Sequence, residues 1–490
     1  MQLLHKPLLL ATLKVFVISF SVLAESAHAD MRDDALRAAK RAVSCLTSLS
    51  TQGGYLWRYA ADLSLREGEG KVDTETIWVQ PPGTPTIGLA LVHLYEATRD
   101  EEFLEAALAA ANALQRGQMV SGGWQAMVEF EPSRRLSWKY RTDMLERPQK
   151  HKGNGKDQSS LDDDKTQSAL RFLIELDRAT EFKYSHVHEC ATYGLSNLVQ
   201  HAQFPNGGFP QVWSTEWDDR SEIIPERAAS FPVTWERTYP GHQNYWRRPT
   251  LNDDLIPDVM RTLLLAYDCY HEDIYLHSAL RAADFLILAQ MPAPQPAWAQ
   301  QYSFGMQPIW ARKFEPPAIS GWESQSAISA LMLAYQRSGD QKYLVPIPLA
   351  LEYLRSSELP DGRLARFYEL QTNEPLYFNT QYELIKDDHD LPTHYGFKVA
   401  NRLESLQEEY EDLTRNSWSK RSSKNLANDS QTPDAAKVRE IVDELDAQGH
   451  WLSALDMRYH QVPGPVIDMG VAAANLELLA DYLHVSRTSE

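Results

Sequence analysis

The chain has 490 residues, of which 43% are hydrophobic and 23% are charged. This composition is that of an ordinary globular protein, and it excludes a disordered chain, a collagen-like repeat and a polytopic membrane protein. With 48 Lys and Arg against 67 Asp and Glu, the formal net charge is -19 at pH 7. A nucleic-acid binder needs Lys and Arg to displace the counterions of phosphates, so this charge argues against nucleic acid as a partner.

Residues 1–29 have the pattern of a secretory signal peptide. Lys6 ends a short positive start, an apolar run follows from Pro7 to Ala24, and Ala27-His28-Ala29 supplies a cleavage pattern of small residues. A membrane anchor is the competing interpretation, but the segment is short for a span and lacks a charged stop-transfer flank. We therefore expect cleavage, a secreted or periplasmic location, and no membrane association of the mature chain.

A helical hairpin repeats along the chain. Each copy has an apolar-periodic helix, a short polar turn, a second helix that starts near a Tyr or Phe, and a loop that contains Gly or Pro. The copies contain the segments LVHLYEATRD, LIELDRATEF, LLLAYDCYHE and LMLAYQRSGD. One hairpin cannot bury its apolar face alone, so neighbouring hairpins must pack into a bundle, a superhelix or an α/α toroid. The sequence thus predicts an all-α fold.

Long irregular stretches interrupt the repeats, from about Val128 to Ser160 and from about Val212 to Arg248. The second is rich in Trp and Tyr, which favours ordered packing or carbohydrate stacking over disorder. Residues 30–400 carry the hairpins, and 401–490 form a charged C-terminal extension. Within this extension we expect a solvated linker over residues 419–434 and a docking helix over residues 467–483.

Cys45, Cys190 and Cys269 are too few and too scattered for a disulfide framework or a structural zinc site. All three fall in helical patterns, where cysteine serves as a small buried apolar residue. A single disulfide stays open as the alternative.

Neighbouring carboxylates open two of the expected helices. Asp162-Asp163-Asp164 precedes KTQSALRFLIELD, and Asn252-Asp253-Asp254 precedes LIPDVMRTLLLAYD. Asp and Asn at a helix start commonly cap the free N–H groups. If both helices point the same way, the two clusters instead offer hard oxygen ligands for Ca²⁺. The spacing alone leaves capping and metal binding both open.

Basic residues stand at loop ends that match these acidic clusters. Arg312 and Lys313 begin the segment RKFEPPAISGWES, and Arg363 and Arg366 lie in a later loop. Exposed cations beside acids such as Glu315 are usually weak surface ion pairs. In so acidic a chain, their concentration at loop ends that match the acidic clusters also makes them candidate functional residues.

Three segments resemble, in this order, signatures of the polysaccharide lyase family ten pectate lyases, the pectic acid lyases: FPNGGFPQ, LNDDL and ARKFEPPAISGWES. The family carries NGGWPQ, a F-N-D-D/G-A segment and an A-R-x-Y-E-P-P-S-x-S-G-x-E-S segment. The match spans about residues 160–380, the lyase-like core. It implies an α/α toroid, an incomplete barrel with long loops at one face, and calcium-dependent β-elimination on polygalacturonate.

The resemblance also implies roles for single residues. Asp162 takes the position of a functional aspartate, and Arg312 that of the arginine used as catalytic base. Asp253 matches the calcium-site aspartate, so the implied metal ligands are Asp162, Asp163, Asp253 and Asp254. The residues expected to bind the substrate are Arg363, Arg366 and Lys313.

Several positions depart from the family pattern. Lys165 stands where the family has Ala, Asp163 where it has Asn, and Phe209 where it has Trp. Trp322 replaces a small residue, and Glu374 stands where Arg is common. We therefore expect a cleft that suits a different uronide or a different degree of esterification.

The function implied is that of a secreted, monomeric, Ca²⁺-dependent pectate lyase that degrades polygalacturonate or a related uronide polysaccharide. A guanidinium is permanently charged in water. Arg312 can act as a base only if neighbouring cations and partial desolvation favour its neutral form. The alternatives are an inverting glycoside hydrolase on an α/α barrel, with two carboxylates as acid and base, and a non-catalytic uronate-binding protein.

Overall fold

The computed structural model describes residues 31–146, 155–415 and 433–488. The expected signal peptide, and the expected linker up to residue 432, lie outside the described residues. The chain forms two compact units. Unit 1 consists of Met1–Thr74, Thr86–Ala110 and Ser430–Glu490, and unit 2 of Glu75–Pro85 and Ala111–Asp429. Among the described residues, no helix combines the length and apolar character needed to cross a bilayer.

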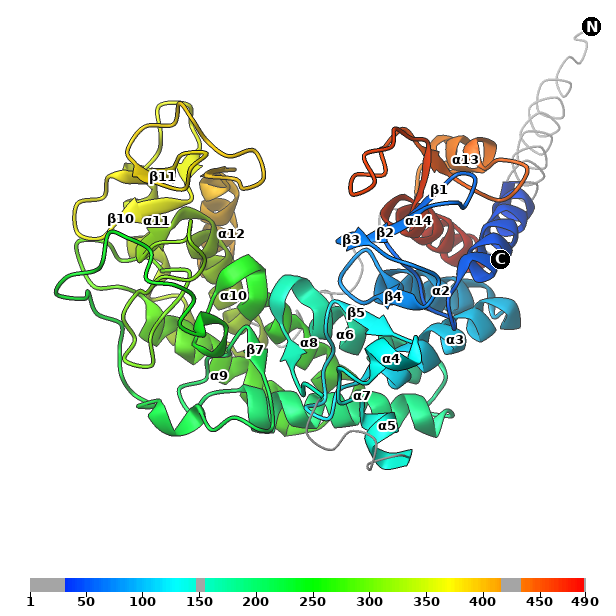
Figure 1. Ribbon diagram of the computed structural model, residues 1–490, viewed down its shortest axis with the longest axis horizontal. Coiled ribbons are helices and arrows are strands. Elements are labelled where there is room, and N and C mark those ends of the chain that lie inside the picture. The colour runs from blue at the N-terminus through cyan, green and yellow to red at the C-terminus, as the bar shows by residue number, and fades with distance from the viewer. Residues whose placement is uncertain (1–30, 147–154, 416–432, 489–490) are drawn as a thin grey trace, which may run out of the picture. The chain divides into compact units, whose positions relative to one another are not determined.

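Unit 1 joins the two ends of the described chain through a sheet of five short strands. The strand order is β14-β15-β1-β2-β3, and β1 pairs antiparallel with β15, with Tyr59 opposite Ile467. In Figure 1 the blue N-terminal strands accordingly lie beside the red C-terminal helix α14. The bounds are 31–49 for the first helix, β1 (Arg58–Ala60), β2 (Arg66–Gly68), β3 (Gly70–Lys71), α2 (Thr84–Thr98), α3 (Glu101–Gly117), α13 (Ala435–Glu444), β14 (Leu452–Ser453), β15 (Val466–Asp468) and α14 (Met469–Thr488).

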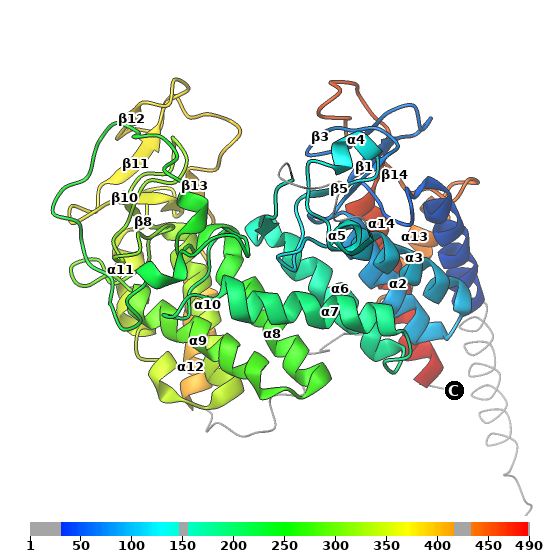
Figure 2. The ribbon, with the colours of Figure 1, turned by 60° about the horizontal axis from the view of Figure 1, so that its bottom comes forward.

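Unit 2 contains the repeated helical hairpins that the sequence predicts. They are formed by α6 (Lys165–Ala179), α7 (Ser185–Asn197), α8 (Leu255–Tyr270), α9 (Asp273–Ala289), α10 (Gly321–Ser338) and α11 (Ile347–Ser356). Helix α8 packs between α6 and α10, and each of these three also packs against the second helix of its own hairpin. Figure 2 shows this succession. The all-α fold of repeated hairpins is thus confirmed, and in unit 2 the hairpins form an arc of an α/α toroid, an incomplete barrel.

The apolar spacing of α8 explains its central place. Leu255, Ile256, Val259, Met260 and Leu263 recur at helical intervals and are all buried. Burial of each such side chain contributes about 1.5–3 kcal/mol, so the packing of this face stabilises the helix more than its intrinsic propensity does.

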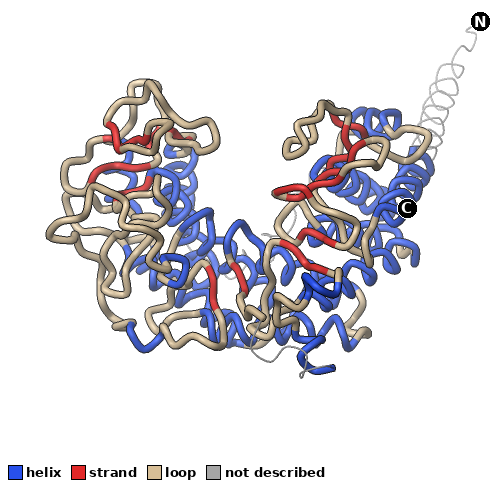
Figure 3. Tube along the Cα trace, viewed as in Figure 1, coloured by secondary structure: helices blue, strands red, loops and turns tan. Residues whose placement is uncertain are grey.

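Short strands and long loops precede and follow these hairpins (Figure 3). Unit 2 also contains β4 (Thr76–Trp78), β5 (Met127–Glu129), α4 (Pro132–Arg135), α5 (Arg141–Glu146), β6 (Ser159–Ser160), β7 (Val212–Trp213), β8 (Ala318–Ser320), β9 (Leu364–Ala365), β10 (Phe367–Glu369), β11 (Pro375–Phe378), β12 (Leu384–Ile385), β13 (Lys398–Val399) and α12 (Leu403–Arg415). Four of the strands form a sheet in the order β12-β11-β10-β8.

The pairing of β8 with β10 places the loop of Arg366 at the start of α10. Ser320 lies opposite Phe367, and the Gly321 N–H donates to the Arg366 carbonyl at 3.0 Å. A Cβ at Gly321 would lie 2.3 Å from the carbonyl oxygen of Ala365. Only glycine permits this close approach, so the backbone itself fixes where Arg366 stands.

The stretch from Val212 to Arg248 is mostly loop, and part of it packs on unit 2. The Trp235 ring meets the Trp310 ring edge to face at 6.0 Å, and the Trp310 indole N–H donates to the Glu236 carbonyl at 2.8 Å. The ordered packing expected from these aromatic residues is thus observed.

All three cysteines are free and buried, which confirms the expectation of small buried apolar residues. At the other end of the chain, α12 packs on α10 and α11 of unit 2, whereas α14 packs on α13 and β15 of unit 1. The boundary drawn at residue 400 stays a prediction of the sequence.

Candidate active site

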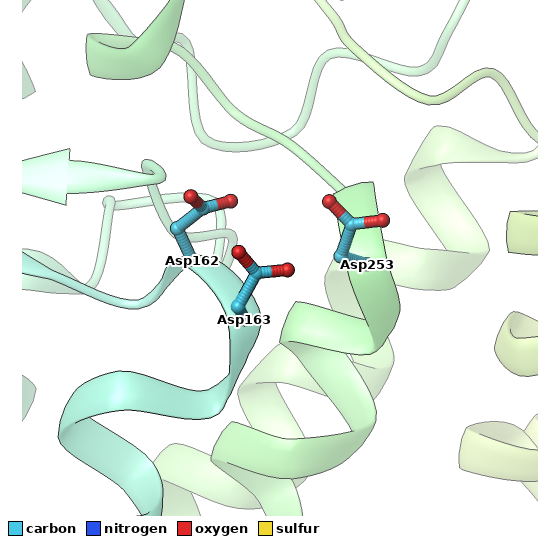
Figure 4. Close-up of side chains that lie close together, drawn as sticks. All are labelled: Asp162, Asp163 and Asp253. Carbon is cyan, nitrogen blue, oxygen red and sulfur yellow. The ribbon is translucent and has the colours of Figure 1, made fainter. Parts of the chain in front are cut away.

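Three of the expected metal ligands converge. Asp162 and Asp163 lie in a short helical turn, η2 (Asp162–Asp164), and Asp253 in another, η6 (Asn252–Asp254). One carboxylate oxygen of each residue lies within 4.8 Å of the others. Figure 4 shows Asp253 facing Asp162 and Asp163 from the start of a different helix. Residues 90 positions apart are brought together because α6 and α8 pack side by side and point the same way.

These aspartates do not cap the helices they precede. Neither turn and neither following helix has a side-chain hydrogen bond at its N-cap. Asp163 and Asp253 have left-handed backbone conformations, with φ of 47° and 50°. Such a conformation costs a non-glycine residue about 1 kcal/mol. The capping interpretation is therefore wrong for these side chains.

Lys165 and Gln211 hold Asp162. The Lys165 ammonium lies 2.8 Å from Oδ2 of Asp162 and 3.6 Å from Oδ2 of Asp163. The Gln211 amide donates to Oδ1 of Asp162. Burial opposes ionisation of Asp162, but the charge and hydrogen bond of Lys165, with that of Gln211, bring its pKa below the usual value.

Arg366 links Asp253 to a buried glutamate. Its guanidinium donates to Oδ1 of Asp253 at 3.3 Å and to Oε1 of Glu323 at 3.0 Å. Burial, followed by the charges of the neighbouring Asp162 and Asp163, raises the pKa of Asp253 to about 6, against the opposing charge of Arg366. Asp162 and Asp253 therefore differ in how readily they lose their protons.

Asp254, the fourth expected metal ligand, is engaged elsewhere. It accepts a hydrogen bond from the Ser326 hydroxyl on α10. It does not belong to the group formed by Asp162, Asp163 and Asp253. Asp164, the corresponding residue after Asp163, accepts from Arg171 in the same manner. Asp164 thus binds its own helix α6 and Asp254 binds the neighbouring helix α10, while Asp163 and Asp253 face the cluster.

The hydrogen-bond partner of Arg312 is the acidic Glu315, whereas neighbouring cations were expected to favour its neutral form. Its Nε lies 2.8 Å from Oε2 and its Nη2 2.5 Å from Oε1 of Glu315, which is buried. Burial disfavours the charged guanidinium, but the hydrogen bonds and charge of Glu315 outweigh this and raise the pKa of Arg312. Without bound ligands, the arginine is therefore held in its charged form. Its positive charge also favours the ionised forms of Asp162 and Asp253, as a smaller contribution than burial and their nearer partners.

Tyr395 contacts both arginines. Its ring centroid is 4.8 Å from the Cζ of Arg366 and 5.6 Å from the Cζ of Arg312. The Tyr395 hydroxyl donates to Oε1 of Glu315 at 3.0 Å. Cation–π contacts therefore join this ring to both guanidinium groups.

A cavity of about 400 Å³ opens beside the cluster. Asp253, Asp254, Trp322, Arg366 and Lys398 line it. This volume is in the range of small-ligand sites, and the lining combines one aromatic ring with charged groups.

Lys313 lines a separate cavity of about 590 Å³, walled by Tyr239, Trp310 and Tyr382. Its ammonium lies 3.3 Å from the centroid of the Tyr382 ring. The structure thus places Lys313 on the same loop as Arg312 but in a different pocket. Arg363 is exposed and pairs with Asp361 at 2.8 Å. The described contacts do not bring Arg363 to the cluster.

The carboxylate cluster fits a calcium ion in its donor chemistry. Ca²⁺ prefers several hard oxygen ligands, and the cluster offers one carboxylate oxygen from each of three aspartates. Asn252 and Gln211 donate through their amide nitrogens to Asp253 and Asp162. The amide oxygens of both residues are buried without a partner among the described residues. A cation bound at the carboxylate cluster would give these unpaired buried oxygens a partner.

Several participants were not predicted from the sequence. The sequence pattern around Glu315 indicates a surface ion pair and gives no sign of a partner for Glu323, yet both glutamates are buried partners of arginines. Tyr395 lies in a segment without a motif. Gln211 closes the segment FPNGGFPQ, so its place in a recognised motif was the one available signal. Lys165 stood out only as a departure from the family pattern.

No protein-family model and no curated protein matches the chain. A mutant of the family 10 polysaccharide lyase from Cellvibrio cellulosa in complex with trigalacturonic acid is 16% identical, with 67% of this chain and 98% of that chain covered and a TM-score of 0.44. An unsaturated glucuronyl hydrolase specific for heparin is 12% identical, with coverages of 93% and 97% and a TM-score of 0.41. A GH76 α-mannanase from Bacteroides thetaiotaomicron is 10% identical, with coverages of 93% and 97% and a TM-score of 0.40. At these identities and TM-scores, the likenesses assign neither a family nor an activity to this chain.

Proposed function

We propose that this chain is a carbohydrate-active enzyme, and specifically a uronate lyase that cleaves polygalacturonate or a related uronide with the help of calcium. The observation that carries the proposal is the convergence of Asp162, Asp163 and Asp253, none of them a helix cap, beside Arg366. Two helix starts that each adopt a strained conformation to present an aspartate favour ligand binding over a structural role.

The reaction is a β-elimination. The proton at C5 of the uronate passes to a base, the bond between C4 and the bridging oxygen breaks, and a C4–C5 double bond forms. The departing oxygen takes a proton and becomes the hydroxyl of the released chain. When bound, calcium would neutralise the uronate carboxylate and so stabilise the negative charge that develops beside C5.

Arg366 and the cavity beside Asp253 are suited to orient the sugar. A planar guanidinium binds a carboxylate through two parallel hydrogen bonds. Trp322 supplies an apolar face in the same cavity, of the kind on which a sugar ring stacks. Lys313 and the aromatic walls of the larger cavity offer a second place for a uronate unit.

Arg312 is the proposed base, and Glu315 is the main obstacle to that role. The guanidinium must lose its proton to act, whereas Glu315 stabilises its charged form. The Nη1 nitrogen of Arg312 has no hydrogen-bond partner among the described side chains, so it is the atom left to meet the substrate. Arg312 therefore works as a base only when positive charge gathers beside it.

A glycoside hydrolase is the second candidate, because the pKa of Asp253 is raised and that of Asp162 is lowered. Two carboxylates whose pKa values are pushed apart are typical of an acid and base pair. However, oxygens of the three aspartates lie within 4.8 Å of one another. An inverting hydrolase needs its carboxyl groups about 6.5–9.5 Å apart to admit water, so the spacing favours a shared cation.

The test is digestion of polygalacturonate with the purified protein, with calcium in one reaction and a chelator in another. The lyase yields products that absorb ultraviolet light through the new double bond, and the chelator abolishes them. Saturated reducing ends that survive chelation would instead identify a hydrolase. Binding without any product, across polygalacturonate, pectin and other uronides, would identify a non-catalytic binding protein.

A further inference from the structure

Lys165 places a positive charge inside the carboxylate cluster. It is the first residue of α6, directly after η2, and its side chain is buried. Its ammonium contacts Oδ2 of Asp162 at 2.8 Å and Oδ2 of Asp163 at 3.6 Å. A lysine is almost never fully buried unless it is paired, so these two carboxylates hold it in place.

The Lys165 ammonium contacts carboxylate oxygens that would otherwise be available to coordinate a metal ion. With Gln211 on Oδ1 and Lys165 on Oδ2, both oxygens of Asp162 accept hydrogen bonds. An ion bound by Asp162, Asp163 and Asp253 would stand a few ångströms from the ammonium. Because Lys165 is buried and the three aspartates are partly buried, repulsion between the two cations is screened less than it would be in bulk water.

We propose that Lys165 is a tethered cation that competes with calcium for this cluster and substitutes for it when calcium is absent. The inference rests on the proposed function only in taking the cluster as a calcium site. The inference predicts that the free protein binds calcium weakly. It also predicts that the three aspartates keep their arrangement when calcium is absent. The ammonium must turn away from Oδ2 of Asp162 when the ion binds, and this movement costs part of the binding free energy.

Lys165→Met tests the competition, because methionine retains much of the apolar stem and removes the charge. Calorimetric titration with calcium chloride is expected to show at least about tenfold tighter binding to this variant than to the wild type, which corresponds to about 1.4 kcal/mol. Lys183→Met is the matched control, since Lys183 is an exposed lysine of unit 2 placed over the Tyr184 ring. It removes the same net charge and is expected to leave calcium affinity unchanged.

Thermal unfolding supplies a second readout. In chelator, Lys165→Met is expected to melt below the wild type, because three carboxylates then repel one another without a cation. Saturating calcium is expected to raise the melting temperature of the variant more than that of the wild type. Should Lys165→Met fail to fold, Lys165→Gln keeps a donor for Asp162 without the charge, and the same comparison applies.

Equal or weaker calcium binding by the folded variant would overturn the inference, and so would calcium binding to neither protein. The product assay separates this result from the proposed function. Unsaturated products without a gain in calcium affinity defeat the role of Lys165 alone. A gain in affinity without unsaturated products defeats the lyase proposal alone.

Discussion

Asp163 and Asp253 adopt the same left-handed backbone conformation, with φ and ψ of 47° and 42° in one and 50° and 49° in the other. Each is the middle residue of a short turn that opens an inner helix, α6 or α8. Two turns that repeat one strained geometry present their aspartates to a common point. The residue that follows each of them is engaged elsewhere, since Asp164 accepts from Arg171 of α6 and Asp254 accepts from Ser326 of α10.

The first prediction compares Asp253 with Asp254. Asp253→Asn is expected to weaken calcium binding by at least about tenfold, because it removes a charged ligand from the cluster. Asp254→Asn changes the same chemical group in the same turn but faces Ser326, so calcium affinity should stay within about twofold. Calorimetric titration of both variants checks this. A larger loss of calcium affinity in Asp254→Asn than in Asp253→Asn would show that Asp254, and not Asp253, is the calcium ligand.

The second prediction concerns stability. Arg366→Met leaves Glu323 buried and unpaired, which is expected to reduce the free energy of unfolding by about 3–5 kcal/mol. The loss should be smaller at pH 5 than at pH 8. Burial already raises the pKa of Glu323, and a protonated carboxyl is less costly to bury than a charged one.

Urea unfolding of Arg366→Met at both pH values measures this loss. Arg363→Met is the control, since Arg363 is exposed and, within the described part of the chain, forms its ion pair with Asp361. It is expected to unfold like the wild type. A loss that grows as the pH falls would contradict the pairing of Arg366 with Glu323.

The third prediction addresses the role of Arg312. If this residue is the base, activity rises with pH as its guanidinium loses a proton. The negative charge of Glu315 raises its pKa, so Glu315→Gln is expected to move that rise to lower pH by at least about one unit. The pH dependence of kcat/KM measures the shift, with circular dichroism as the check on folding. An unchanged pH profile in a folded, active variant would remove Arg312 as base.

The fourth prediction tests the larger cavity. Lys313→Met removes the ammonium from the aromatic pocket and is expected to raise KM for polygalacturonate about tenfold with kcat unchanged. Steady-state kinetics on long and short oligogalacturonates distinguishes this pocket from the centre. An equal effect on the shortest cleavable substrate would place Lys313 at the reacting sugar instead.

The hairpins of unit 2 were predictable because their apolar residues recur with helical period, as in α8. The two aspartate clusters were predictable as pairs of acids at helix starts. The short distance between the two clusters was not predictable, because it depends on how α6 packs against α8. Nor did local pattern reveal that β1 pairs with β15 in unit 1, because strands of three residues carry almost no periodic signal.

The buried charges show the same limit. Glu315 follows two cations in sequence, which is typical of a surface ion pair, yet it is buried against Arg312 and Tyr395. Burial of a charged residue depends on the loops that cover it, and these come from distant parts of the chain. The local pattern around Glu315 therefore did not reveal that it is buried or which residues are its partners.

Elimination at the Asp162, Asp163 and Asp253 centre can be tested by mass spectrometry of polygalacturonate products formed in water labelled with heavy oxygen. A lyase gives chains with a new non-reducing end that is one water lighter than a hydrolysis product, and no label enters at the cleaved bond. These products should require calcium and disappear in Asp253→Asn. Products of full mass that carry one labelled oxygen per cleavage would contradict the lyase proposal.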